Sequence, residues 1–291
     1  MSKHDIAICV CTRRRPGGII KLLKSIEKLQ VPEGLLFKVI VVENDQVPRT
    51  KSNIIRFKST SKLEIEYYLE KNPGIAYARN RSVGEAKGVR FCCFVDDDQI
   101  VDKEWLTELL RCQSEYDADG VWGPNPPVFE QPVPGYVTHF HQPEIYEYGA
   151  PVRQAYTNCL LLRRECLEQL DGPFDVRLNY TGGEDSYLTA RLVKMNYTIR
   201  YTPHAIAYEL VPQKRVTLKY MMRRTIRTIN TKYIVIQLLN PDFSRTSIFV
   251  TMLLRIAKGF LISIPCLLFC KERKMDGLLK IAHGWGGILF L

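Results

Sequence analysis

Short, almost entirely apolar stretches that each end at a cluster of polar side chains constrain the fold of this chain most. The stretches Ile6–Cys11, Phe37–Val42 and Phe91–Val95 show no polar alternation, which is typical of strands buried on both faces. Ile65–Leu69 is a further candidate strand, and Gly74–Lys87 has the character of a helix. Strands that alternate with helices at this spacing predict an α/β fold with a mainly parallel sheet and right-handed crossovers.

Polar clusters follow three of the predicted strands, at Thr12–Arg15, Glu43–Asp45 and Asp96–Asp98. Ligands of open parallel sheets bind beyond the carboxyl ends of the strands, so we expect a site where these clusters meet. The three consecutive aspartates repel one another unless they are solvated or neutralised by a cation. Their position predicts a site for Mg²⁺ or Mn²⁺, and the alternative is a solvated turn.

Two features beyond these clusters also suggest a site. Gly182–Asp185 opens a predicted helix, where glycines let the backbone approach a ligand and a carboxylate is favoured by the helix dipole. Arg79 lies in the predicted helix after Gly74, near the expected ligand edge, and suits a diphosphate. The alternatives are an ordinary acidic first turn and an exposed helix arginine.

Composition narrows the class of protein. Of 291 residues, 46% are hydrophobic and 25% charged, which excludes intrinsic disorder and a protein with many membrane spans. The nine cysteines include no CxxC pair and mostly lie in apolar runs, as expected of reduced thiols in a cytosolic chain. No signal-peptide pattern precedes the first strand, so we expect no secretion.

Charge is distributed unevenly along the chain. Lys214–Lys280 holds fourteen Lys or Arg and three acidic residues, a net of +11, whereas the rest of the chain carries −1. Because aliphatic residues separate these charges, we expect an anionic membrane surface as partner, before a phosphorylated substrate or nucleic acid. The stretch Ile248–Cys270 is interrupted by Arg255, Lys258 and Pro265, which favours a helix in the membrane interface over a span. A core-packed helical pair is the alternative.

Six segments, taken in order, carry a family resemblance. They are IAICVCTRRRP, VIVVENDQ, NPGIAYARNRSVGEAKG, FCCFVDDDQIVDKEWL, TNCLLLRREC and GGEDSYLTARLVKMNYTIRYTPHAIAYE. With them the sequence resembles glycosyltransferase family 2, the inverting, GT-A-fold sugar transferases of bacterial surface polysaccharide synthesis, over about residues 5–235. The resemblance implies a nucleotide-sugar-binding half (1–100), an acceptor-binding and catalytic half (101–215) and a basic, apolar helical C-terminal region (216–291) that associates with the membrane.

The resemblance also implies an activity: metal-dependent transfer of a sugar from a nucleoside-diphosphate sugar to a hydroxyl of a glycan or lipid-linked glycan. The cofactor would be Mg²⁺ or Mn²⁺. The protein would lie in the cytoplasm, on the inner face of the cell membrane. The implied site residues fall into four groups: Asp185 as general base; Thr12, Arg14, Glu43, Asp45, Arg79, Asp96 and Asp97 for the nucleotide sugar; Asp96 and Asp98 for the metal; and Glu184, Arg223 and Arg224 for acceptor or diphosphate.

Two departures from the family pattern are visible. Glu43-Asn44 replaces the usual Asp-Asp or Asp-Asn pair, which leaves the identity of the nucleotide base open, and Glu209 stands where a histidine is frequent.

Three competing functions also remain. A nucleotidyltransferase shares the sheet and the metal carboxylates, although CTRRRPGG is a poor phosphate loop. The second is a catalytically inactive, membrane-docked glycan- or nucleotide-binding protein, and the third is a nucleic-acid binder that uses the basic region.

Overall fold

The computed structural model describes residues 4–242, 251–259 and 271–288. The chain divides into two compact units. The first consists of residues up to Val128, Pro143–Tyr180 and Glu184–Leu210, and the second of Phe129–Gln142, Thr181–Gly183 and Val211 onward.

A seven-stranded sheet forms the centre of the first unit, in the order β3-β2-β1-β4-β8-β6-β9. Its strands are β1 (Ile6–Thr12), β2 (Phe37–Asn44), β3 (Ile65–Glu70), β4 (Phe91–Asp96), β6 (Gly120–Trp122), β8 (Leu160–Arg163) and β9 (Ile199–Tyr201). The pairs β1–β2, β1–β4, β2–β3 and β6–β9 are parallel. Strand β8 runs antiparallel to both β4 and β6. The α/β fold with a mainly parallel sheet is therefore confirmed.

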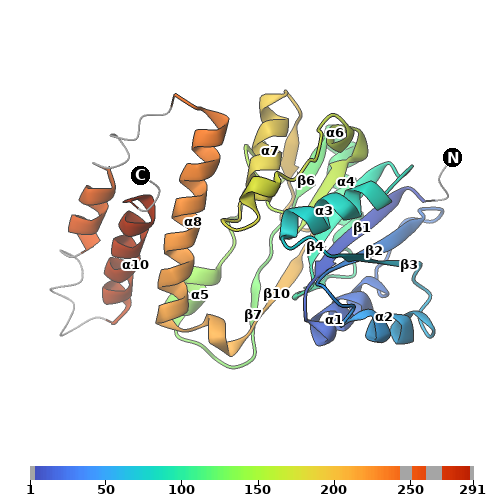
Figure 1. Ribbon diagram of the computed structural model, residues 1–291, viewed down its shortest axis with the longest axis horizontal. Coiled ribbons are helices and arrows are strands. Elements are labelled where there is room, and N and C mark those ends of the chain that lie inside the picture. The colour runs from blue at the N-terminus through green and yellow to red at the C-terminus, as the bar shows by residue number, and fades with distance from the viewer. Residues whose placement is uncertain (1–3, 243–250, 260–270, 289–291) are drawn as a thin grey trace. The chain divides into compact units, whose positions relative to one another are not determined.

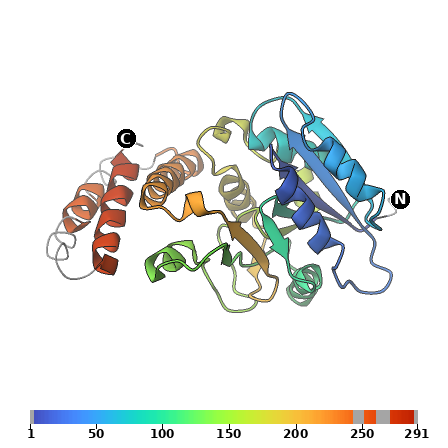
Figure 2. The ribbon, with the colours of Figure 1, turned by 90° about the horizontal axis from the view of Figure 1, so that it is seen from below.

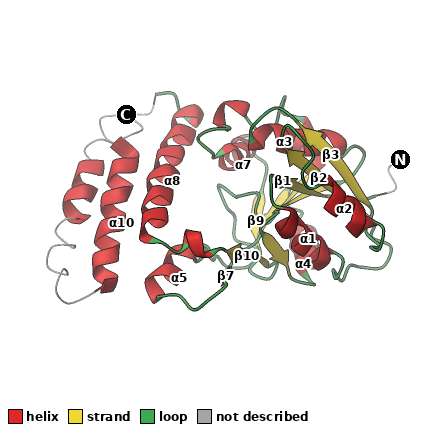
Figure 3. Ribbon diagram, turned by 60° about the horizontal axis from the view of Figure 1, so that its bottom comes forward, coloured by secondary structure: helices red, strands yellow, loops and turns green. Residues whose placement is uncertain are grey.

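Helices cover both faces of this sheet (Figures 1 and 3). One face packs on α1 (Pro16–Ile26), α2 (Lys51–Lys58) and α4 (Trp105–Tyr116), and the other on α3 (Ile75–Glu85), α6 (Arg164–Glu168) and α7 (Glu184–Lys194). Side chains of β1 alternate between the two layers: Ile6, Ile8 and Val10 enter the first, Ala7 and Cys9 the second. This burial on both faces explains the unbroken apolar runs of the sequence.

A second, three-stranded sheet has the order β5-β10-β7, with β5 (Gln99–Val101) antiparallel to β10 (Ala207–Val211) and β7 (Pro127–Phe129) at the other edge. Strand β5 begins directly after the aspartate triplet, so the small sheet fixes the far side of that turn. Two 3₁₀ helices complete the connections, η1 (Val176–Leu178) and η2 (Gln213–Arg215).

The second unit is helical. It contains α5 (Gly135–His141), α8 (Leu218–Leu239), a helix over 251–259 and α10 (Lys271–Ile288). Figure 2 shows the 251–259 helix beside α10, and glycines allow the contact: a Cβ on Gly284 would lie 2.4 Å from the Ile256 side chain. Among the described residues, no helix is long and apolar enough to cross a membrane.

Several elements differ from the prediction or lie outside it. The sequence analysis did not predict α2, nor β7 and α5, which lie between Pro124 and Pro151. Of the predicted interfacial stretch Ile248–Cys270, only 251–259 is described; it is helical, and the rest lies outside the described residues. All seven cysteines in the described part of the chain are free, in agreement with the expectation of thiols.

Candidate active site

Three polar strand ends meet at one edge of the large sheet. Strand β1 lies between β2 and β4, with Thr12 paired to Glu43 and Cys11 paired to Asp96. The clusters predicted from sequence to form a site therefore come together.

The turn that carries the aspartate triplet is held on several sides. The Thr12 hydroxyl donates to Asp97 Oδ2 at 2.7 Å, and the Gln99 side chain accepts the Asp96 N–H at 2.9 Å. Helix α1 packs so closely that a Cβ on Gly18 would lie 2.6 Å from the Asp97 carbonyl oxygen. Such support fixes the direction of the carboxylates before any ligand binds.

Two arginines neutralise the triplet. Arg15 Nη1 donates to Asp97 Oδ1 at 2.7 Å and to Asp98 Oδ2 at 3.1 Å, and Arg79 Nη2 lies 3.5 Å from Asp96 Oδ1. Desolvation and the adjacent carboxylates raise the pKa of Asp96 to about 7, although Arg79 opposes the shift. Three carboxylates thus share two cations, and the turn attracts further positive charge.

The carboxylates at this turn suit a metal ion whose coordination is completed by a bound ligand. In the described ranges, no group of three His, Cys, Asp or Glu side chains is placed to hold one. Asp96 and Asp98 supply carboxylate oxygens at one turn, and Mg²⁺ is commonly held by one or two carboxylates together with substrate phosphates. The residues therefore fit a metal ion shared with a bound diphosphate.

Arg79 connects the triplet to the start of α7. Its guanidinium forms an ion pair with Glu184 through Nη1, approaches Asp96 through Nη2 and lies 5.7 Å from the centre of the Phe174 ring. Both Arg79 and Glu184 are buried, at 8% and 4% exposure. The arginine predicted to contact the nucleotide is thus engaged with carboxylates of the chain itself.

Asp185 follows Glu184 at the start of α7 and remains partly exposed. Its Oδ1 accepts the Ser186 N–H at 2.7 Å, while the backbone N–H and hydroxyl of Thr157 point to Oδ2 at 3.4 and 3.5 Å. Thr189 ties α7 to the Thr157 segment through the Ala155 carbonyl at 3.0 Å. Thr157 was not predicted, because its proximity to Asp185 depends on the packing of α7.

The acidic residues after β2 are also held. Glu43 is fully buried and accepts the Thr50 N–H at 2.9 Å and the Tyr67 hydroxyl at 2.6 Å. Asp45 accepts Arg14 Nε at 2.8 Å, and this hydrogen bond, together with that from the Gln46 N–H, lowers the pKa of Asp45 to about 2. Arg14 adopts a left-handed conformation, with φ of 56°, which is rare outside glycine.

The remaining predicted residues lie on α8 of the second unit. Arg224 donates to the Tyr220 hydroxyl at 3.4 Å, and Arg223 is exposed. Their role toward acceptor or diphosphate stays a prediction. The same helix holds the segment that precedes Glu184, since the Thr231 hydroxyl donates to the Thr181 carbonyl at 2.7 Å.

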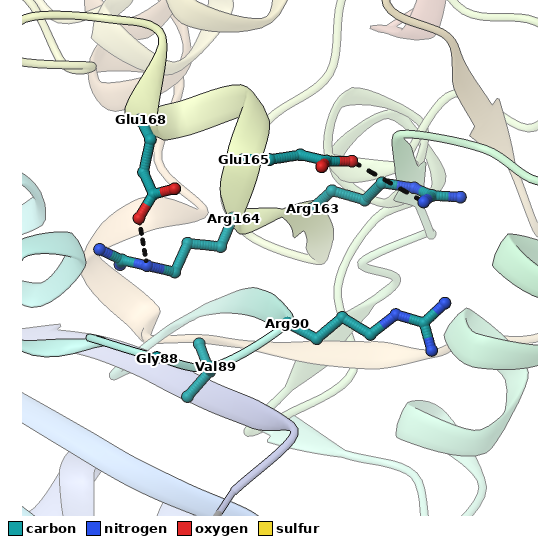
Figure 4. A pocket seen from close by; sticks show the side chains of 7 residues that line it. All are labelled: Gly88, Val89, Arg90, Arg163, Arg164, Glu165 and Glu168. Carbon is teal, nitrogen blue, oxygen red and sulfur yellow. Dashed lines mark ion pairs between the residues drawn. The ribbon is translucent and has the colours of Figure 1, made fainter. Parts of the chain in front are cut away.

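A pocket of about 320 Å³ lies at the opposite end of β4 (Figure 4). Its arginines serve the fold. Arg164 donates to the Val83 and Ala86 carbonyls, at 3.0 and 2.8 Å, at the end of α3, and Arg163 forms an ion pair with Asp117. We therefore assign this pocket no part in the candidate site.

Known proteins match this chain in sequence. The family model described as glycosyl transferase family 2 matches residues 7–170. The succinoglycan biosynthesis protein ExoM of Rhizobium meliloti (strain 1021) is 31% identical over 228 residues, which cover 78% of this chain and 73% of ExoM.

Solved structures share the fold. The mannosyltransferase PcManGT from Pyrobaculum calidifontis, in complex with GDP-Man and Mn²⁺, is 16% identical with a TM-score of 0.71, covering all of this chain and 88% of its own. S. aureus TarS 1–349, in complex with UDP, is 20% identical with a TM-score of 0.57, covering 97% and 89%.

Proposed function

Since the chain belongs to glycosyltransferase family 2 and is a glycosyltransferase, we propose that it transfers a sugar from a nucleoside-diphosphate sugar to a hydroxyl of a polysaccharide precursor, either a glycan or a lipid-linked glycan. The name of ExoM supports polysaccharide biosynthesis as the setting. The UDP complex of TarS and the GDP-Man and Mn²⁺ complex of PcManGT support a nucleotide sugar as donor and a divalent metal as cofactor.

One observation carries the proposal. Arg79 lies between Asp96, at the end of β4, and Glu184, next to Asp185 on α7. One buried guanidinium therefore connects the carboxylates suited to a metal and diphosphate with the start of α7, where Asp185, the carboxylate suited to a base, lies. Transfer to a hydroxyl needs these two groups on either side of the anomeric carbon.

At the donor end, Asp96 and Asp98 would hold Mg²⁺ or Mn²⁺. When bound, the ion neutralises charge on the leaving diphosphate. Thr12 keeps Asp97 fixed, so the turn need not reorganise when the donor binds. Glu43 and Asp45 lie at the adjacent strand end, where the base of the nucleotide would lie.

At the acceptor end, Asp185 would accept the proton of the attacking hydroxyl. Ser186 and Thr157 contact its two oxygens and hold the carboxylate in one orientation. The deprotonated oxygen then displaces the nucleoside diphosphate in a single in-line step that inverts the anomeric centre. No covalent intermediate with the protein is needed.

The second unit would bind the membrane that carries a lipid-linked acceptor. Its described helices expose Leu253, Leu254 and Trp285, and Lys214–Lys280 is strongly basic. Basic charge with exposed apolar side chains suits the anionic inner leaflet. Sedimentation with vesicles should show binding to phosphatidylglycerol–phosphatidylcholine mixtures and none to phosphatidylcholine alone; equal binding to both would contradict an electrostatic contribution.

The test of the function is Asp185→Asn. Uridine and guanosine diphosphate sugars are incubated with Mn²⁺ and membrane-extracted glycan lipid, and release of the nucleoside diphosphate is measured. We expect the variant to bind the donor as the wild type does and to lose about 10²-fold or more in rate, as when a general base is removed. The control is Asp171→Asn, an exposed carboxylate that should leave both properties unchanged.

Two results would contradict the assignment. Loss of donor binding in Asp185→Asn would make Asp185 a donor ligand instead of a base. Release of inorganic pyrophosphate by the wild type, in place of a nucleoside diphosphate, would indicate a nucleotidyltransferase.

A further inference from the structure

Arg15 belongs to the polar cluster after β1 and contacts the aspartate turn, but the sequence predicted no individual role for it. It lies at the N-cap of α1, and its side chain is 46% exposed. One nitrogen, Nη1, serves both Asp97 and Asp98. Its other three N–H groups, on Nε and Nη2, have no acceptor among the described residues.

The position of Arg15 conflicts with a metal ion at the same turn. Asp98 is one of the two carboxylates that would hold the ion, and Arg15 Nη1 lies 3.1 Å from its Oδ2. A divalent cation and a guanidinium at that carboxylate repel each other. Since Asp97 keeps the Thr12 hydroxyl, at 2.7 Å, departure of Arg15 would not leave Asp97 without a donor.

The surroundings of Arg15 favour an anion. Helix α1 begins without a side-chain cap and without an acidic residue in its first turn, and it has Pro16, Gly17 and Gly18 as its first residues. Its N-terminal N–H groups therefore add positive potential beside the unused N–H groups of Arg15. A diphosphate that arrives with a metal ion would give Arg15 a new acceptor and draw its guanidinium away from Asp98.

We propose that Arg15 is a diphosphate-binding residue that covers Asp98 until the nucleotide arrives, so that the metal ion binds well only together with the nucleoside diphosphate. This inference rests on the proposed function. It adds an order of binding: Arg15 weakens binding of the metal alone and strengthens binding of the nucleotide once the metal is present. A residue that merely stabilises the turn would strengthen both.

The test compares Arg15→Gln with Lys21→Gln. Lys21 is exposed on α1 and forms no hydrogen bond or ion pair with any described residue, so the control removes one positive charge outside the Thr12–Arg15 cluster. Binding of Mn²⁺ alone is followed by the electron paramagnetic resonance signal of free Mn²⁺. Binding of UDP and of GDP at saturating Mn²⁺ is followed by calorimetry, and thermal melts verify that each variant is folded.

We expect Arg15→Gln to bind Mn²⁺ alone more tightly than wild type, by up to about fivefold, the range of a partly exposed ion pair. We expect it to bind the preferred nucleoside diphosphate about tenfold more weakly or worse, through loss of a charge-assisted hydrogen bond. Lys21→Gln should change neither constant by more than about twofold.

The outcomes separate the inference from the function. Weaker Mn²⁺ binding in Arg15→Gln, or behaviour equal to Lys21→Gln, overturns the role of Arg15 while wild-type nucleotide binding keeps the proposed function intact. A folded wild type that binds neither UDP nor GDP with Mn²⁺ overturns both.

Discussion

Replacing Arg79 by methionine should lower the free energy of unfolding by about 3–5 kcal/mol, the range for removing one partner of a buried ion pair. Two features of the structure support a loss of this size. Its partner Glu184 is 4% exposed, and the second carboxylate oxygen of Glu184 has no hydrogen-bond partner in the described part of the chain. Without the guanidinium, the buried carboxylate keeps no neutralising group.

The size of the effect makes it measurable by thermal unfolding. For a chain of this size, about 2–4 °C accompanies each kcal/mol, so the midpoint should fall by roughly 6–20 °C. Methionine retains the length of the arginine stem, so the packing against Phe174 is largely preserved.

A double variant separates the ion pair from packing. Arg79→Met combined with Glu184→Leu removes both charges and leaves an apolar contact between α3 and α7. Because buried ion pairs are often replaced by apolar residues at little cost, the double variant should recover most of the lost stability. The reasoning is refuted if Arg79→Met lowers stability by less than about 1 kcal/mol, the value of an exposed pair, or if the two losses simply add.

Contacts at the strand ends give two further predictions. Gly18→Ala should weaken both stability and nucleotide binding, because the new Cβ would lie 2.6 Å from the Asp97 carbonyl oxygen. Gly17→Ala is the control and should be neutral or slightly stabilising, because a Cβ at Gly17 meets nothing within 4 Å. Equal melting points for the two variants would contradict the close packing of Gly18 on the aspartate turn. Asp45→Asn should destabilise the chain at neutral pH, because Arg14 holds the pKa of Asp45 at about 2, below that of an unfolded chain. That loss should shrink as the pH falls from about 4 to 2 in denaturant titrations; a loss independent of pH would argue against the ion pair.

The sequence predicted the parts of the fold whose signal is local. Buried parallel strands appear as apolar runs, and Ile6–Cys11 and Phe91–Val95 were located to within one residue of β1 and β4. The direction of β8 was not predictable, since an apolar run has the same pattern in either orientation. Strands β5, β6 and β7 are three residues long, too short for a periodic signal.

The parts of the candidate site that lie at strand ends could be predicted from the sequence. The contacts between side chains far apart along the chain could not. The clusters at Thr12 and Asp96 follow apolar runs, so their meeting could be inferred from topology alone. The pairing of Arg15 with Asp98 spans 83 positions along the chain, and that of Thr157 with Asp185 spans 28. Such contacts are set by the packing of α1 and α7 on the sheet, which no local pattern encodes.

The most direct test of the central claim is thermal unfolding of the wild-type chain with UDP, GDP and their sugar conjugates, each with and without Mn²⁺. Ligands that bind the folded state raise the midpoint by mass action. We predict stabilisation by one nucleotide class, and only when Mn²⁺ is present. Stabilisation by no nucleotide in a folded sample, or stabilisation that does not depend on Mn²⁺, would contradict a metal-dependent glycosyltransferase site at the aspartate turn.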